Sequence, residues 1–166
     1  MNDQNADPIV CYLLLRTDLE SLGRGKAQAH AMHAGNHLTH VLCVKPLLAG
    51  GDIDPRVEEW CEEDGFGTTL SVGGADIVDI EVLEGVVCAA EKCGHMAGLV
   101  IDGSYPFQVS DEIHDLLDPR LQTLPARRSR DGWTCFRRET TAGWVLGRKS
   151  ELGVLMARFG LTPNDR

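Results

Sequence analysis

A run of seven apolar residues near the start of the chain, Ile9–Leu15 (I-V-C-Y-L-L-L), constrains the fold more than any other segment. A strand with one face in water alternates polar and apolar residues, and this run does not alternate. It therefore predicts a strand covered on both faces, as in sheets that lie between two layers of helices. The run is too short to cross a membrane, and the polar segment 1–8 has no basic start typical of a targeting signal. We expect a cytoplasmic protein with no membrane partner.

The rest of the chain alternates helical and extended patterns, which predicts an α/β protein. Helical patterns cover 26–45 (ended by Pro46), 56–63, 80–93 and 150–159, and strand patterns cover 66–72, 97–101, 133–137 and 142–147. We expect a single domain over 1–166 with three layers, α/β/α, around a mixed, mostly parallel sheet of four to five strands. The proline-containing stretch 104–132 is expected to be a long irregular insertion.

The net charge of −9 argues against a protein that coats nucleic acid indiscriminately, because such binding requires basic residues that neutralise phosphates. The charge is unevenly divided along the chain. Residues 1–119 hold six basic and 21 acidic side chains, whereas residues 120–166 hold ten basic and four acidic ones. The basic part is compatible with a localised anion site, and a solvated basic surface is the alternative.

A glycine-containing loop connects the apolar strand to the first helix and carries three basic residues, Arg16, Arg24 and Lys26. Ligands of α/β proteins collect at the carboxyl ends of strands, and the N-terminus of a helix attracts anions. The loop therefore predicts a phosphate or oxyanion site, although its spacing is not that of a Walker loop. The alternative is a glycine turn followed by a solvated lysine.

Four histidines, His30, His33, His37 and His40, follow at steps of three, four and three, so a helix would present them on one face. Such a face is either a polar or substrate-facing surface or a metal site. No compact partner motif of cysteines or carboxylates accompanies the histidines, and we therefore expect no metal and no cofactor.

Two further places combine polar side chains with the ends of strands. Asp102 follows the apolar strand 97–101, where a carboxylate can act as an acid or base, although an Asp-Gly turn is the commoner role. Thr140 and Thr141 stand just before the final strand pattern. The threonines carry no functional meaning by themselves.

Taken in order, these segments resemble the type II peptidyl-tRNA hydrolases over roughly residues 9–149. In that family a first strand ends in R-x-D-L, and a glycine, a lysine and a helix of the type K-x-A-x-Q-x-x-H-A follow. Here Arg16–Leu19 reads R-T-D-L and Gly25–Ala34 reads G-K-A-Q-A-H-A-M-H-A. The family's later D-A-G-x-T and T-x-T-V-L-G segments correspond to Leu99–Pro106 (L-V-I-D-G-S-Y-P) and Thr140–Gly147 (T-T-A-G-W-V-L-G).

The resemblance implies hydrolysis of the ester that joins a peptide to the terminal ribose of a tRNA, and hence a role in translation. The implied catalytic groups are Lys26 and Asp102 with the threonine hydroxyls, here Thr140 and Thr141. It also implies a homodimer. The residues expected to bind the tRNA substrate are Arg16, Asp18, Arg24, His30, His33, Ser104, Arg127, Arg128 and Arg130.

The chain departs from the family pattern at three positions. His30 stands in place of the glutamine, Pro106 in place of the threonine after Asp102, and Trp144 in place of the threonine before V-L-G. Because neither proline nor tryptophan has a hydroxyl, a second hypothesis remains: a non-catalytic member of the same fold that binds RNA or a small anionic ligand. A metal-binding protein that uses the histidine face is the third.

Overall fold

The computed structural model describes residues 7–19, 23–62, 67–72, 78–116 and 125–161. The chain forms two compact units. Met1–Val100 together with Thr141–Arg166 make up the first, which we call the sheet unit, and Ile101–Thr140 make up the second, which we call the hairpin unit. Among the helices in these ranges, none combines the length and the apolar character needed to cross a bilayer.

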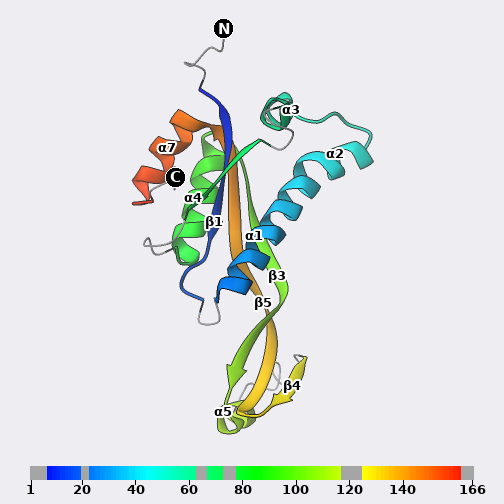
Figure 1. Cartoon of the computed structure of the whole chain (residues 1–166), viewed down its shortest axis with the longest axis vertical. Helices are drawn as coiled ribbons and strands as arrows, with labels where there is room; N and C mark the ends of the chain where they lie inside the picture. Colours follow the sequence, from blue (N-terminus) through cyan, green and yellow to red (C-terminus); the bar gives the residue numbers. More distant parts are fainter. Residues whose placement is uncertain (1–6, 20–22, 63–66, 73–77, 117–124, 162–166) are drawn as a thin grey trace. The chain divides into compact units, whose positions relative to one another are not determined.

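The fold is built on a five-stranded mixed sheet (Figure 1). Its main path has the order β2 (Thr68–Val72), β1 (Ile9–Leu15), β5 (Gly132–Arg148) and β3 (Met96–Val109), and β4 (Ala126–Ser129) pairs with β5 outside that path. The apolar run therefore forms a central strand, with β2 parallel on one side and β5 antiparallel on the other. Tyr12 shows the arrangement, since it pairs with Leu70 of β2 and with Val145 of β5.

The α/β class and the mixed sheet are confirmed, but the prediction of a mostly parallel sheet is wrong. Within the described residues, β1 and β2 form the only parallel pair. A chain of helices connects these two strands, and such a crossover brings the chain back in the same direction. β5 instead follows β3 and β4 in the chain, lies between β1 and β3 in the sheet, and pairs antiparallel with its neighbours.

Two strands are longer than expected. The separate strands predicted at 133–137 and 142–147 are one strand, β5, and the strand predicted to end at residue 101 continues as β3 to Val109. Pro106 lies inside β3, which ends the main path of the sheet, and an edge strand tolerates the missing N–H of a proline. The prediction of an irregular 104–132 is therefore wrong where β3, β4 and the short helix α5 (Asp111–Leu116) lie, and 117–124 fall outside the described residues.

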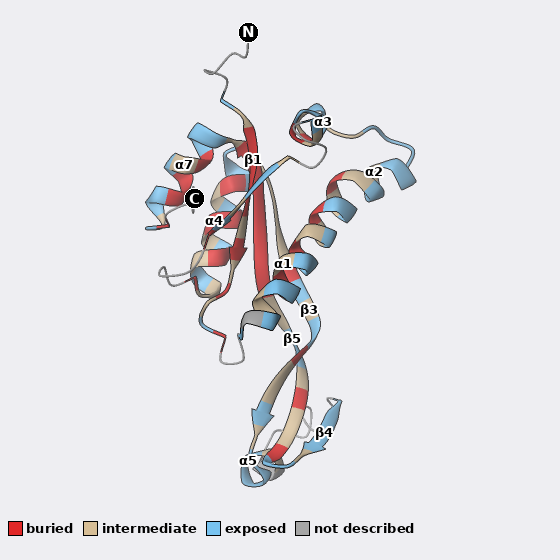
Figure 2. Cartoon of the chain, viewed as in Figure 1, coloured by how far each residue is buried: buried red, intermediate tan, exposed pale blue. Residues whose placement is uncertain are grey.

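Helices cover both faces of the sheet unit, as the apolar run predicts. Val10, Tyr12 and Leu14 of β1 pack in one core cluster with α4 (Ile80–Lys92) and α7 (Lys149–Arg158). Ile9 and Cys11 pack in a second cluster with α1 (Arg24–Thr39) and α3 (Pro55–Glu62). Figure 1 shows α4 and α7 together on one side of the sheet and α1 on the other, and Figure 2 shows that β1 is buried between these layers.

The first helix does not end at Pro46, where the sequence predicts its end. It continues through a π-helical turn, His40–Val44, into α2 (Lys45–Leu48), which contains the proline. The N–H of Lys45 bonds to the carbonyl of His40, five residues earlier. Because proline has no N–H and sits in the first turn of α2, the change of hydrogen-bond pattern lets the helix pass this residue.

The hairpin unit holds the outer parts of β3 and β5, together with α5 and β4. β4 pairs antiparallel with β5, and Arg128 lies opposite Trp133. Gly132 begins β5 with a φ of 131°, and a Cβ at this position would lie 2.4 Å from the carbonyl oxygen of Val109. Both the backbone angle and the close approach require glycine at this turn.

Gly98 provides a test of the packing in the sheet unit. A Cβ at this position would lie 2.7 Å from the ring of Trp144, which is 1 % exposed and whose indole N–H donates to His37. We expect Gly98→Ala to lower the free energy of unfolding by roughly 1–3 kcal/mol, because the ring is too tightly held to move freely. Urea denaturation measures the change.

Gly153→Ala is the matched control, because nothing lies within 4 Å of a Cβ at this position of α7. It is expected to leave the stability unchanged or to raise it by about 0.5–1 kcal/mol through helix propensity. Equal stability of Gly98→Ala and the unsubstituted protein would contradict the packing described for Trp144.

Candidate functional site

The carboxyl end of the central strand carries an ion pair between a buried arginine and an exposed aspartate. Arg16, the residue after β1, is 6 % exposed, and its Nε and Nη2 donate to the two carboxylate oxygens of Asp18 at 2.8 and 2.6 Å. The backbone N–H of Arg16 donates to the carbonyl of Thr141 at 3.2 Å. The structure thus joins two motifs that lie more than a hundred residues apart in the sequence.

The ion pair between Arg16 and Asp18 determines the charge at this strand end. Because Asp18 accepts hydrogen bonds from the Arg16 guanidinium and lies beside its positive charge, the pKa of the Asp18 carboxyl lies below its ordinary value. The buried charge of Arg16 is therefore balanced within the same three residues. An anion that reached this guanidinium would have to compete with Asp18 for its N–H groups.

Thr17 attaches the same loop to the start of α4. Its N–H donates to the carbonyl of Val78, and its Oγ1 accepts from the N–H of Val78, both at 2.9 Å. Asp79 follows as the N-cap of α4 and accepts from the N–H of Val82 at 2.9 Å. These bonds hold the R-T-D-L segment in one conformation.

Thr141 is a buried hydroxyl at this end of the sheet unit. The residue is fully buried, and within the described ranges its Oγ1 has no hydrogen-bond partner. A buried hydroxyl without a partner costs about 1–3 kcal/mol. A bound water or a substrate atom can supply the missing bond. Of the two predicted threonines, Thr141 is therefore the stronger candidate for a functional hydroxyl.

The loop ends where α1 begins, and Lys26 lies in the first turn of that helix. Gly23 is the N-cap in an extended conformation, and its carbonyl accepts from the N–H groups of Lys26 and Ala27 at 2.9 and 3.0 Å. The first turn contains no acidic residue. Lys26 is half-buried, and the side chain of Arg24 lies outside the described residues. A helix start with a lysine and no carboxylate favours negative charge.

The four histidines of the helix do not share one environment. His30 is buried, and His37 is half-buried, where its Nδ1 accepts from the indole N–H of Trp144 at 3.0 Å. His33 and His40 are exposed. Burial, and then the charge of His40, lowers the pKa of His37, in agreement with a neutral ring that accepts a hydrogen bond. In the part of the chain that the structure describes, no three histidines, cysteines or carboxylates are arranged to hold a metal ion.

Asp102 belongs to the hairpin unit, as do Ser104 and Thr140, whereas Lys26 and Thr141 belong to the sheet unit. One carboxylate oxygen of Asp102 accepts from the N–H of Ser104 at 2.8 Å and from its hydroxyl at 3.3 Å. Asp102 and Ser104, both predicted site residues, therefore bind each other. The Asp-Gly turn that the sequence left open for Asp102 is not formed, since residues 102–104 lie within β3.

The predicted arginines of the hairpin unit differ in their contacts. Arg128 forms an ion pair with Asp111 at 2.8 Å and lies 5.2 Å from the ring of Trp133. Arg127 lies 5.9 Å from the ring of Phe136. Arg130 is exposed in the turn between β4 and β5. The three residues therefore do not form one cluster.

A cavity of about 490 Å³ collects basic residues on the hairpin unit. Two of its lining residues, Ser104 and Arg127, are predicted site residues, whereas Phe136, Arg137 and Arg138 are not among those predicted. Two features of the sequence point to these residues. One is the excess of basic residues in 120–166, and the other is the alternation of side chains that a single strand over 133–140 would have. The cavity is thus lined by positively charged arginines and by one aromatic ring, that of Phe136.

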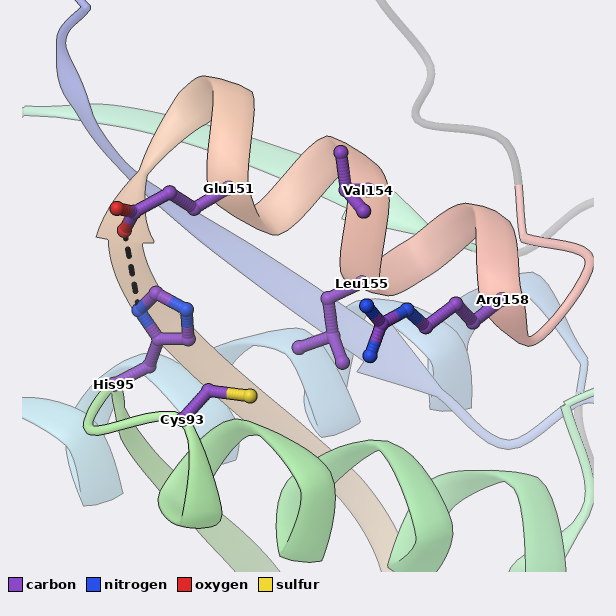
Figure 3. Close-up of a pocket in the computed structure, with 6 residues that line it drawn as sticks. All are labelled: Cys93, His95, Glu151, Val154, Leu155 and Arg158. Carbon is purple, nitrogen blue, oxygen red and sulfur yellow. Dashed lines mark ion pairs between the residues drawn. The ribbon is translucent and has the colours of Figure 1, made fainter.

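A second cavity of about 340 Å³ lies in the sheet unit between α7 and the end of α4 (Figure 3). Glu151 faces His95 across it, with 3.9 Å between a carboxylate oxygen and Nδ1. Cys93 lines the same cavity, but the described residues contain no hydrogen bond between its thiol and His95. Cys93, His95 and Glu151 therefore lack the thiol–base contact that a nucleophilic cysteine requires.

No family model matches the chain, and no curated protein matches it. The resemblance to the type II peptidyl-tRNA hydrolases consequently stays a prediction from the quoted motifs.

Asp18→Asn tests the electrostatics of the strand end. Because Arg16 holds the pKa of Asp18 below its ordinary value, ionised Asp18 stabilises the fold. That contribution is complete above the unfolded pKa of about 3.9 and is lost as the pH falls through the lower folded pKa. We expect the variant to have a lower free energy of unfolding at about pH 7, and the gap to narrow as the pH falls from about 4 towards 2.

Urea denaturation over this pH series gives the gap directly. Asp52→Asn, at an exposed carboxylate elsewhere in the sheet unit, is the control and should leave the free energy of unfolding unchanged across the series. A gap for Asp18→Asn that did not depend on pH would show that the ion pair does not stabilise the fold.

Proposed function

We propose that this protein hydrolyses the ester bond between the peptide and the tRNA of peptidyl-tRNA. The observation that carries the proposal is the hydrogen bond from Arg16 to Thr141 at the end of the central strand. It joins the two motifs that carry the resemblance, R-T-D-L and T-T-A-G-W-V-L-G, at the strand end where ligands of α/β proteins collect. Lys26 follows in the first turn of the next helix.

The chemistry needs an activated water and a group that stabilises negative charge on the acyl oxygen. The water oxygen attacks the ester carbon, its proton passes to a base, and the ribose hydroxyl leaves with a proton. We assign the stabilisation of the oxyanion to the ammonium group of Lys26, which adds to the positive end of α1. The buried Thr141 hydroxyl is the proposed partner of the water or of the ester oxygen. Asp102 is assigned the role of base from the resemblance.

A non-catalytic protein that binds RNA or a small anion is the second candidate. The Asp102 carboxylate is already engaged by Ser104, and Trp144, which replaces a family threonine, is buried and bonded to His37. On this hypothesis tRNA binds and is released unchanged. For either function we retain tRNA as the partner and a homodimer as the expected assembly, which light scattering measures.

Lys26→Ala is the first variant to compare with the unsubstituted protein in a peptidyl-tRNA hydrolysis assay. Loss of the charge that stabilises the oxyanion should lower kcat by about 100-fold or more. Asp102→Asn should lower it by a similar factor if the carboxylate takes the proton. Lys45→Ala, which removes an exposed lysine of α2, is the matched control and should retain full activity.

The result decides between the two candidates. Hydrolysis by the unsubstituted protein, with loss in Lys26→Ala and none in Lys45→Ala, supports the enzyme. Intact peptidyl-tRNA after long incubation with a protein that binds it supports the non-catalytic candidate and overturns the proposal.

A further inference from the structure

The hairpin unit has two unlike faces, because side chains alternate along a strand. The pairing of β4 with β5 places Arg128 beside Trp133 on one face and Arg127 beside Thr134 on the other. The successive residues Phe136, Arg137 and Arg138 continue this alternation along β5. We call the face with Arg128 and Trp133 the covered face and the face with Arg127 and Thr134 the open face.

Aromatic and acidic partners occupy the covered face. His114 of α5 stacks on Trp133 with 4.4 Å between ring centroids, and Cys135 is buried. The two arginines on this face have carboxylate partners: Arg128 pairs with Asp111 at 2.8 Å, and Arg137 pairs with Glu139 at 2.7 Å. The positive charge of the covered face is therefore largely cancelled.

The open face keeps its positive charge. Arg127 and Arg138 are exposed, and neither has an ion pair with a carboxylate among the residues that the structure describes. Both line the 490 Å³ cavity together with Ser104, the half-buried Phe136 and Arg137, whose charge Glu139 already balances. Thr134 accepts a hydrogen bond from Gln108 at 2.7 Å, which ties β3 to β5 next to the cavity. The volume lies within the range of ordinary ligand sites.

We propose that the open face binds an unpaired RNA strand, with phosphates on Arg127 and Arg138 and a base stacked on Phe136. Proteins that hold single strands combine a positive groove with aromatic rings, and this cavity supplies both within one strand pair. An acidic peptide would use the two arginines but gains little from the ring. The inference rests on the proposed function for the choice of RNA, and it adds the surface that holds the strand.

The test is fluorescence anisotropy with a labelled RNA of twelve nucleotides that forms no hairpin, titrated with the full chain at several salt concentrations. Arg127→Gln/Arg138→Gln should weaken binding at least 10-fold at about 50 mM salt and lower the slope of log K against log salt by about 1.4, or 0.7 for each lost phosphate contact. Phe136→Leu should weaken binding roughly 5- to 150-fold with little change in the slope.

Lys45→Gln/Lys92→Gln is the matched control, since it removes two positive charges from exposed lysines of α2 and α4 in the sheet unit. Its effect should stay within about twofold, because neither lysine lines the cavity. Equal losses in this control and in the double variant would overturn the proposal, since binding would then follow the net charge alone. Affinity for a poly-glutamate peptide that equals the affinity for RNA and is unaffected by Phe136→Leu would also overturn it, in favour of an acidic partner.

The hydrolysis assay separates this inference from the proposed function. If the protein binds the RNA through Arg127, Arg138 and Phe136 but never cleaves peptidyl-tRNA, the surface stands and the enzyme fails. If the double variant and Phe136→Leu bind RNA and hydrolyse peptidyl-tRNA as well as the unsubstituted protein does, the enzyme stands and the surface fails.

Discussion

The burial of β1 on both faces is the constraint on which the rest of the structure depends. A strand between two helical layers has no access to water, so its polar backbone groups must pair with neighbouring strands, here β2 and β5. Its side chains must be apolar on both sides, as Ile9–Leu15 are. The first position at which this part of the chain can place charge is the strand end, and Arg16 stands there with its own counter-ion, Asp18. The candidate site thus begins where the core ends.

The same constraint explains a departure from the family pattern. Trp144 lies in β5 directly beside β1, opposite Leu13, on the face covered by α1. Its ring fills the space above Gly98, and its indole N–H bonds to His37. A residue so placed belongs to the core, and its loss would leave a large cavity. The proposed function therefore draws its hydroxyl from another residue, and Thr141, three residues earlier, is the buried hydroxyl nearest in sequence within the sheet unit.

Local patterns predicted the elements well but not their connections. The apolar run, the amphipathic spacing of 80–93 and the helical composition that begins at Lys26 depend on neighbouring residues, and the corresponding elements β1, α4 and α1 are present. The direction of β5 depends on how the chain returns to the sheet, which no local pattern contains. Pro106 and Pro125 made 104–132 resemble an irregular loop, although the edge position of β3 tolerates the first of them. Because the sequence predicts an irregular 104–132 and only a short, separate strand at 133–137, it does not predict that Arg137, Arg138 and Phe136 share a cavity with Ser104 and Arg127.

The central claim is that water, activated in this protein, cleaves an ester at its acyl carbon. Incubation of peptidyl-tRNA with the protein in water enriched in oxygen-18, followed by mass spectrometry of both products, tests it most directly. Attack at the acyl carbon predicts one heavy oxygen atom in the carboxyl group of the released peptide and none in the tRNA. Intact peptidyl-tRNA, or a released peptide without the label, would contradict the account.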